Sequence, residues 1–220
     1  MFDYPTQAEV SRVLPKNKIY AHAKANNALQ RAFIEEVEKI EWRYKLASET
    51  INLSPRHGIH EIQVFEIQLR KPQLRENVLR AIDSTIRHPI AFQLVHSSRM
   101  QCAMTAKRKN AADPSKWVLG EYFRTEWHAE SHPPLSSLPP VLDLHALYEQ
   151  ILRQHLPYPP KENETLPEHM ERISRIKHLQ RDAEQLQSKI LKEKQFNRKV
   201  ELNQQLKSLN SELERLTNET

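Results

Sequence analysis

Glycine is nearly absent from this sequence. Gly58 and Gly120 are the only two glycines among 220 residues. A P-loop that cradles phosphates needs two glycines separated by four residues and followed by lysine, and a dinucleotide-binding fingerprint needs three glycines close together. Two glycines that lie so far apart build neither motif. The sequence therefore excludes a P-loop ATPase and a glycine-fingerprint dehydrogenase, and a partner would have to supply any ATP site.

Cysteine and long apolar runs are also lacking. Cys102 is the single cysteine, which excludes an internal disulfide and a multi-cysteine zinc site. No stretch approaches the roughly 20 apolar residues that are needed to span a bilayer. The N-terminus, MFDYPTQAEV, has neither the basic start nor the apolar run of a secretory signal. These absences predict a cytoplasmic protein, and no metal or other cofactor is expected.

Positive charge is unevenly distributed along the chain. Residues 1–120 contain 19 Lys/Arg against 12 Asp/Glu, a balance of +7. Residues 121–165 contain 3 against 7, and residues 166–220 contain 11 against 9. The basic excess therefore belongs to the N-terminal region. Such an excess is typical of a solubilising surface and also of a face that binds nucleic acid, and both interpretations stay open.

Apolar periodicity predicts a mixed α/β (α+β) domain over residues 1–160, in which helices flank a mixed sheet. Residues 1–18 are expected to be extended, because Pro5 and Pro15 disfavour a helix. The best strand is Ile59–Arg70, which has apolar residues on both faces, as expected of an interior strand. Proline-rich residues near 130–140 predict a connector. The remaining elements are expected as helices at 21–39, 73–87 and 142–156 and as strands at 40–46, 50–53, 89–95, 100–107 and 117–127.

Residues 166–220 predict a coiled-coil helix, because no glycine or proline follows Pro167. Apolar residues step by three and four along two seams, which is the pattern by which helices pair. The two seams are out of phase, and the slip falls within Leu191–Leu202. Either a stutter in one long helix or a bend that folds two helices into a hairpin absorbs the slip. A single amphipathic helix that packs on its own domain is the alternative interpretation. The residues expected to bind a partner, a second copy or each other are Leu179, Leu186, Ile190, Leu206, Leu209 and Leu213.

The predicted order of a helix, three strands, a helix and a strand is the core of the PD-(D/E)xK nuclease fold. In that fold an acid on the second strand and an E-x-K motif on the third hold a divalent metal beside the scissile phosphate. Here Glu66 and Gln68 take the third-strand place, and Asn52 takes the place of the second-strand acid. Glu35 or Glu36 is available from the first helix. One carboxylate and two amides make a weak Mg²⁺ site.

Glu66 also has a purely structural interpretation, as a strand charge paired with Arg43 or Lys45. Three interpretations of the sheet therefore stay open: an active nuclease, an inactive and degenerate relative of the PD-(D/E)xK fold, and an unrelated α/β sheet. Mg²⁺ is expected as a cofactor only in the first of them.

A basic run offers a candidate nucleic-acid site. It consists of Lys107, Arg108 and Lys109, with Arg99 nearby and Trp117 and Tyr122 downstream. Cations interleaved with aromatic residues suit contact with phosphates combined with stacking on bases. The alternative interpretation is a solvated hairpin tip.

Read along its whole length, the sequence resembles an uncharacterised bacterial family, domain of unknown function 4391. The segments that carry the resemblance are LPKNKIY at Leu14–Tyr20, FIEEVEKIEWRYKL from Phe33, TINL at Thr50, EIQVFEIQL at Glu61, HPIAF at His88 and KEKQFNRKVELN from Lys192. The resemblance implies a small partner of a helicase and a DNA methyltransferase, encoded in clusters of the restriction-modification or antiphage type. It carries no catalytic residues to this chain.

The residues and the resemblance together predict an accessory, non-ATPase subunit of a bacterial DNA-targeting defence or restriction-modification-like complex. The expected partners are a helicase, a DNA methyltransferase or both, with DNA and a second copy of the chain as further candidates. A metal-dependent nuclease centred on Glu66 is the alternative function. A second alternative is a purely structural adaptor that never touches DNA.

Overall fold

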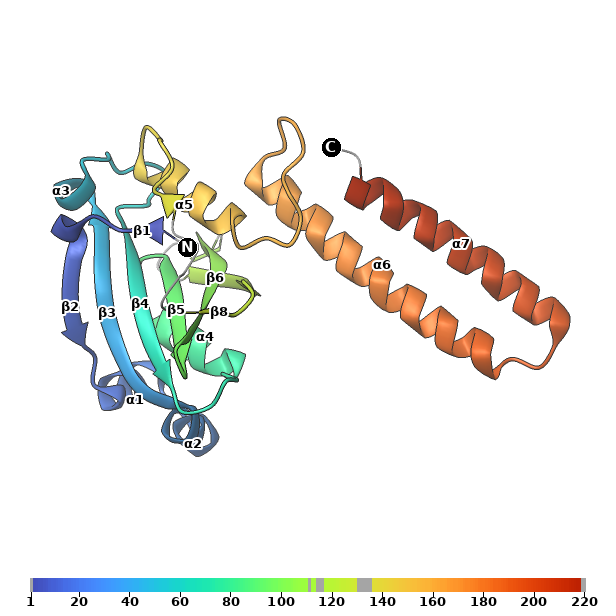
Figure 1. Ribbon diagram of the computed structural model, residues 1–220, viewed down its shortest axis with the longest axis horizontal. Helices are drawn as coiled ribbons and strands as arrows, with labels where there is room; N and C mark the ends of the chain where they lie inside the picture. Colours follow the sequence, from blue (N-terminus) through green and yellow to red (C-terminus); the bar gives the residue numbers. More distant parts are fainter. Residues whose placement is uncertain (1, 111, 114–116, 130–135, 219–220) are drawn as a thin grey trace. The chain divides into compact units, whose positions relative to one another are not determined.

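The computed structural model describes residues 2–110, 112–113, 117–129 and 136–218, so part of the expected proline-rich connector lies outside the described residues. The chain divides into two compact units, Met1–Leu156 and Pro157–Thr220. The first unit is a sheet flanked by helices, and the second is a pair of long helices (Figure 1).

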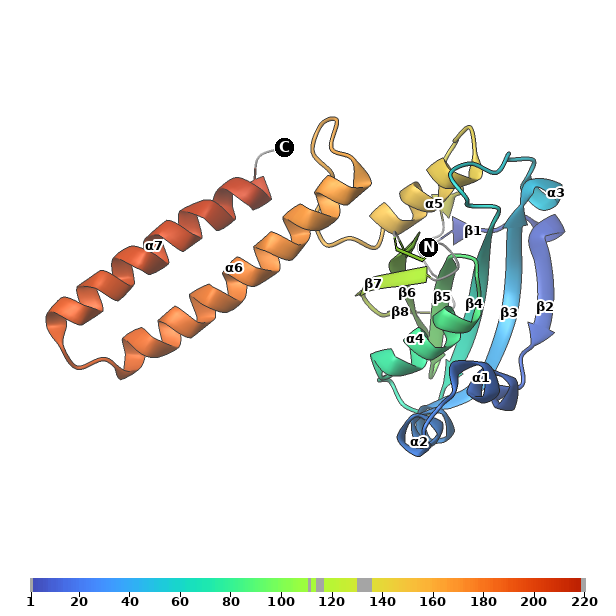
Figure 2. The same ribbon diagram turned by 180° about the vertical axis from the view of Figure 1, so that it is seen from behind.

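A seven-stranded mixed sheet organises the first unit in the order β2-β3-β4-β5-β6-β7, with β8 paired to β6 (Figures 1 and 2). β4 and β5 run parallel, whereas the other neighbouring strands are antiparallel. A parallel pair needs a crossover connection, which α4 supplies. The strands are β2 (Glu9–Val13), β3 (Val37–Ala47), β4 (Glu61–Leu69), β5 (Ile90–His96), β6 (Arg99–Lys109), β7 (Trp117–Arg124) and β8 (His128–Ala129), while β1 (Phe2–Asp3) and β9 (Ser136–Ser137) pair separately.

Helices cover both faces of this sheet. α1 and α4 lie in front of the strands in Figure 2, and the main core forms beneath them from residues that include Phe65 and Ile67 of β4 and Ile82 of α4. Ile62 and Val64 alternate with the core residues of β4 and are also buried, but they do not belong to that cluster. α5 contacts β4 and β6. β4 is therefore buried on both faces, and the predicted α/β fold class is confirmed. The helices of this unit are α1 (Lys16–Ala23), α2 (Asn27–Glu36), α3 (Ser48–Ile51), α4 (Glu76–Thr85) and α5 (Leu144–Arg153).

The N-terminal part differs from the expectation. The helix expected at residues 21–39 is two helices, because Lys24 adopts a left-handed conformation with φ 47° and ends α1. Asn26 then caps α2, since its side chain accepts a hydrogen bond from the Leu29 backbone N–H at 2.9 Å. Residues 37–39 belong to β3, and Glu9–Val13 of the expected extended arm forms the edge strand β2.

The strand expected at residues 50–53 is wrong. These residues enter the short helix α3, which ends where Asn52 adopts a left-handed conformation with φ 55°. The Thr50 hydroxyl donates to the Lys45 carbonyl at 2.6 Å and accepts from the Ala47 N–H at 2.9 Å, which turns the chain away from an extended course. Between α2 and α4 the order is therefore strand, short helix, strand, and the three-strand succession expected for a nuclease core is not formed there.

The second unit is a helical hairpin. α6 (Leu166–Lys192) and α7 (Phe196–Asn218) are joined by residues 193–195, inside the segment where the two seams slip out of phase. They run antiparallel, because Arg172 donates to the Leu216 carbonyl at 3.1 Å and Arg175 pairs with Glu212. The hairpin alternative is thus confirmed, and one continuous helix is excluded.

The base of the hairpin is fixed by a buried ion pair. The Arg172 guanidinium donates from Nε and Nη2 to the two carboxylate oxygens of Glu164, at 2.7 and 2.8 Å. This contact lowers the pKa of Glu164 to about 2. A capping box between Thr165 and Glu168 begins α6 just beside it. Among the described residues, no helix is long and apolar enough to cross a membrane.

Candidate functional site

Glu66 lies opposite a second carboxylate. Glu66 on β4 and Glu41 on β3 are direct partners in the antiparallel ladder, and their side chains are 14% and 9% exposed. The Arg43 guanidinium lies 3.6 Å from Glu41 and 3.7 Å from Glu66, and Lys39 also pairs with Glu41. The two carboxylates are therefore neutralised by cations of β3, and the pairing of Glu66 with Arg43 is the one that its structural interpretation predicted.

The other residues of the expected nuclease site lie elsewhere or carry no charge. Gln68 donates an amide N–H to Glu66 at 3.4 Å, whereas Asn52 ends α3. Glu36 accepts the Arg75 backbone N–H at 2.9 Å and pairs with that arginine's side chain, and Glu35 pairs with the same arginine at 3.1 Å. These two acids thus anchor the chain ahead of α4. Within the described residues, no group of three potential metal ligands is assembled.

The prediction from sequence missed Glu41. Its place opposite Glu66 depends on the register of β3 against β4, which contains a bulge between Trp42 and Tyr44. A bulge shifts which residues face each other, and apolar alternation alone does not locate it. The alternation Ile40-Glu41-Trp42 was the only available signal that Glu41 points to the face opposite the main core.

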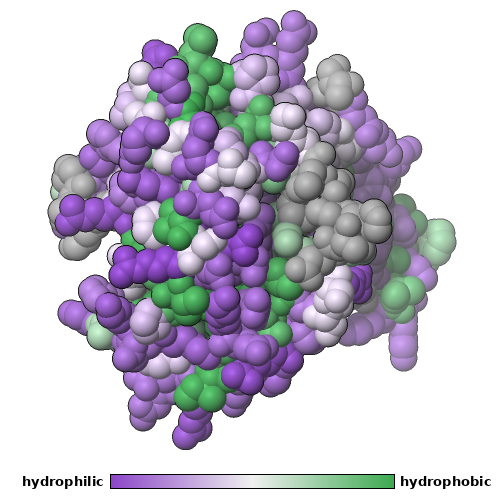
Figure 3. Space-filling model, turned by 60° about the vertical axis from the view of Figure 1, so that its left-hand side comes forward, coloured by the Kyte–Doolittle hydropathy of each residue, from purple (hydrophilic) through white to green (hydrophobic). Residues whose placement is uncertain are grey.

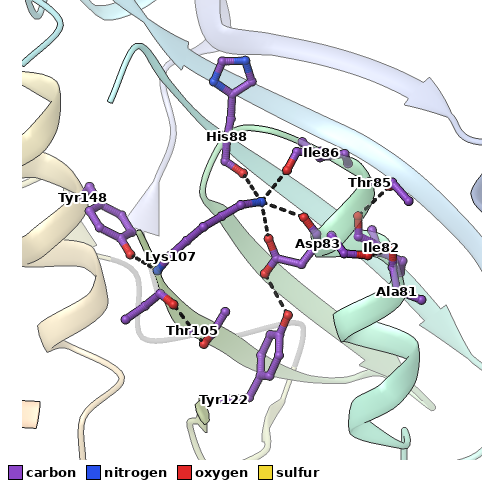
Figure 4. A network of polar contacts seen from close by, with 12 residues as sticks. Ala81, Ile82, Asp83, Thr85, Ile86, His88, Thr105, Lys107, Tyr122 and Tyr148 are labelled. Atoms are coloured by element: carbon purple, nitrogen blue, oxygen red, sulfur yellow. Dashed lines mark hydrogen bonds and ion pairs between the residues drawn. The ribbon is translucent and has the colours of Figure 1, made fainter. Parts of the chain in front are cut away.

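Lys107 lies in the interior, in contrast to its expected place at a basic surface. Its side chain is 1% exposed, and its ammonium binds the Asp83 carboxylate at 2.8 Å (Figure 4). The same Nζ donates to the backbone carbonyls of Asp83 at 2.6 Å and His88 at 3.1 Å, and to that of Ile86. Tyr122 donates its hydroxyl to the other Asp83 carboxylate oxygen at 2.8 Å.

The contacts of this pair offset part of the cost of burying its charges, and the net shifts are a raised pKa for Asp83 and a lowered pKa for Lys107. Burial raises the pKa of Asp83 and lowers that of Lys107, while the attraction between the two charges acts in the opposite direction on both. Oxygen acceptors surround Nζ near the C-terminal end of α4, where the helix dipole favours a cation. The Lys107 backbone N–H is also held, by the Tyr148 hydroxyl at 2.7 Å. Lys107 therefore ties α4, β6, β7 and α5 together and cannot reach a phosphate outside.

The rest of the predicted basic site divides between two places. Arg108 and Lys109 are exposed at the end of β6, and Trp117 is the ladder partner of Lys109 on β7. Lys109 also passes over the turn at Gly58, a residue with φ 79° that favours glycine. Arg99 lies at the start of β6, roughly 33 Å from Lys109 along this 11-residue strand. The structure thus leaves Lys109 exposed on the same face as Trp117 and Arg108 exposed on the opposite face of the strand, and Arg99 is not part of this group.

The predicted partner-binding residues line the inner side of the hairpin. Leu179 is buried, but Leu186, Ile190, Leu206, Leu209 and Leu213 are only half-buried although α6 and α7 pack on each other. A groove of about 450 Å³ runs along one side of the helix pair, and its lining includes Gln185, Leu186, Ser208 and Leu209. In a pair of helices each helix covers only one side of the other's apolar seam, so part of this seam stays exposed to solvent.

The surface on the β2 side of the first unit is different in character. Hydrophilic side chains dominate it, and apolar patches are small and separate (Figure 3). The buried core of a permanent protein interface is usually more apolar than such a surface. This face therefore suits solvent or a polar ligand.

The model of the family described as Domain of unknown function (DUF4391) matches residues 2–213. The chain belongs to the DUF4391 family. No curated protein and no solved structure matches this DUF4391 chain. The match spans the sheet unit and nearly all of the hairpin, so both units belong to the family pattern.

Proposed function

We propose that this chain is an accessory, non-ATPase subunit of a bacterial DNA-targeting defence or restriction-modification-like complex. The observation that carries the proposal is the half-buried seam of the hairpin. A helical pair that leaves leucines wet along a groove is suited to receive a further helix. The family resemblance makes a helicase or a DNA methyltransferase the expected owner of that helix.

The chain's own residues define what it contributes to such a complex. Two distant glycines build no ATP-binding loop, so the partner supplies the energy of ATP. The sheet unit contributes a basic balance, and two of its exposed cations, Arg108 and Lys109, lie at the end of β6, where Lys109 is the ladder partner of Trp117. We therefore assign partner binding to the hairpin and DNA contact to the open end of β6 and β7.

Replacing Arg108 and Lys109 together by alanine is expected to weaken DNA binding. Each phosphate that is no longer neutralised should lower the slope of log K against log salt by about 0.9 on duplex DNA. Fluorescence anisotropy with a labelled duplex across a salt series measures this slope. Lys18 and Arg31, which are exposed on α1 and α2, provide a control double variant with the same loss of charge. An unchanged slope in the first variant, or an equal decrease in both, would remove this end of the sheet from the interface.

A metal-dependent nuclease is the second candidate, and the facing carboxylates Glu41 and Glu66 favour it. A hard divalent cation binds carboxylate oxygens, and two of them lie on neighbouring strands. Arg43 is close to both carboxylates, however, and Gln68 stands where the fold requires lysine. A cation would have to displace the guanidinium, so the accessory role is the better supported function.

The purified protein is accordingly expected not to cut DNA. The test incubates it with duplex and single-stranded DNA in Mg²⁺ or Mn²⁺, beside Glu66→Ala and Glu41→Ala variants. Cleavage that requires the metal and disappears in both variants would establish the nuclease instead. A protein that binds its partner but no DNA in any form would be the purely structural adaptor.

A further inference from the structure

The turn between α6 and α7 exposes three large apolar side chains. Leu191 is 84% exposed, Phe196 is 79% exposed and Val200 is 40% exposed. Phe196 and Val200 are four residues apart and share one face of α7. Six residues at 3.6 per turn place Phe196 about 120° around the helix from the buried Leu202, so this face is not the seam. Packing of α6 on α7 thus does not explain why the Phe196 side chain is exposed to solvent.

The same turn is strongly basic. Residues 189–201 contain five Lys/Arg against two Asp/Glu. Both acids are engaged, because Glu201 pairs with Arg198 at 3.3 Å and Glu193 accepts the backbone N–H groups of Lys194 and Gln195 at 2.8 Å. Within the described residues, no carboxylate pairs with the four lysines of this turn, which are Lys189, Lys192, Lys194 and Lys199.

The placement of two cations is unfavourable within the hairpin itself. Arg198 and Lys199 lie in the first turn of α7, which contains no acidic residue. The helix dipole has its positive end there and disfavours cations. Arg198 has Glu201 as a partner, but among the described residues no carboxylate pairs with Lys199, so a ligand outside the hairpin is left to offset the unfavourable placement of this lysine. The ligand that suits this placement is anionic.

We propose that the hairpin tip, residues 189–200, binds single-stranded nucleic acid. The lysines contact successive phosphates and Phe196 stacks on a base, the combination by which proteins hold single strands without sequence preference. A membrane surface is less suited, because an interfacial helix needs an apolar face along much of its length. A permanent protein partner is also less suited, because three apolar side chains make a small interface core. The inference rests on the proposed function in one respect: a complex that contains a helicase would supply the single strand.

The test uses the full-length chain and a fluorescein-labelled 20-nucleotide oligo-dT, with anisotropy as the readout. Phe196→Ala is expected to weaken binding at least about fivefold and to leave the salt slope unchanged, because base stacking is removed while every charge stays in place. The triple variant Lys192→Gln, Lys194→Gln and Lys199→Gln is expected to lower the salt slope by about 0.7 for each phosphate that is no longer bound. Binding to the matching duplex should be weaker than to the single strand.

The control removes the same charge elsewhere on the hairpin. Arg181, Lys207 and Arg215 are exposed on α6 and α7 away from the tip, and their replacement by glutamine should preserve most of the affinity. An equal loss of affinity in the control and tip variants would overturn the proposal, as would unchanged binding by Phe196→Ala. Binding to vesicles with 30% phosphatidylserine but not to the oligonucleotide would also overturn it. Co-purification of the partner with Phe196→Ala is expected to be normal, so failure at the tip is distinguishable from failure of the proposed function.

Discussion

Replacing Lys107 by alanine is expected to lower the free energy of unfolding by about 3–5 kcal/mol, the usual cost of removing one member of a buried ion pair. The Asp83 carboxylate would keep Tyr122 as a donor but would lose the ammonium that neutralises it. The carbonyls of Ile86 and His88 would lose their donor as well. Urea unfolding followed by circular dichroism measures the change.

Two comparisons make this prediction specific. Lys109→Ala removes a neighbouring but exposed lysine and should change stability by less than about 0.5 kcal/mol. The double variant Lys107→Met/Asp83→Leu should recover a large part of the loss, because apolar residues of similar size need no counter-charge. A stable Lys107→Ala protein, equal to Lys109→Ala, would contradict the structural role. So would a double variant that is less stable than either single one.

The buried pair shows what the sequence could not reveal. Lys107 belongs to a run of three cations that is compositionally uniform, although the first member is buried and the next two are exposed. A register shift between Thr105 and Lys107 in the pairing with β7 moves the lysine from its expected alternation. Its partner Asp83 lies 24 residues earlier on a different element. Only the packing of α4 on the sheet brings the two together.

Other parts were predictable for equally physical reasons. β4 and β5 contain apolar residues on both faces, a pattern that few other structures accommodate. The phase slip between the two leucine seams falls within Leu191–Leu202, and the turn of the hairpin at residues 193–195 lies inside this segment. The strand expected at residues 50–53 failed because one hydroxyl, that of Thr50, closes a local turn that competes with the sheet.

The second large effect is expected from the hairpin. Removing residues 161–220 should abolish partner binding and leave the sheet unit folded, because its main core cluster lies entirely within residues 19–122. The groove itself is tested by Gln185→Arg/Ser208→Arg, which places bulk at two exposed lining positions without touching the leucines. This variant should weaken partner binding at least tenfold.

A matched control exists on the same helices. Gln187 and Gln204 are exposed, and they are not among the residues that line the groove. Gln187→Arg/Gln204→Arg therefore adds the same charge and similar bulk outside the groove, and partner binding should stay normal. Equal weakening by the two double variants would mean that added charge, and not occupation of the groove, disrupts the complex.

Co-purification tests the central claim most directly. The tagged full-length chain and a chain ending at Pro160 are each co-expressed with the two partners that the proposed function names, a helicase and a DNA methyltransferase from the same genome, and the masses of the recovered complexes are measured by multi-angle light scattering. We expect the full-length chain to retain at least one of these proteins in a defined ratio and the shortened chain to emerge alone, with circular dichroism showing it folded. Retention of the same partner by the shortened chain, or no partner with either chain, would contradict the account.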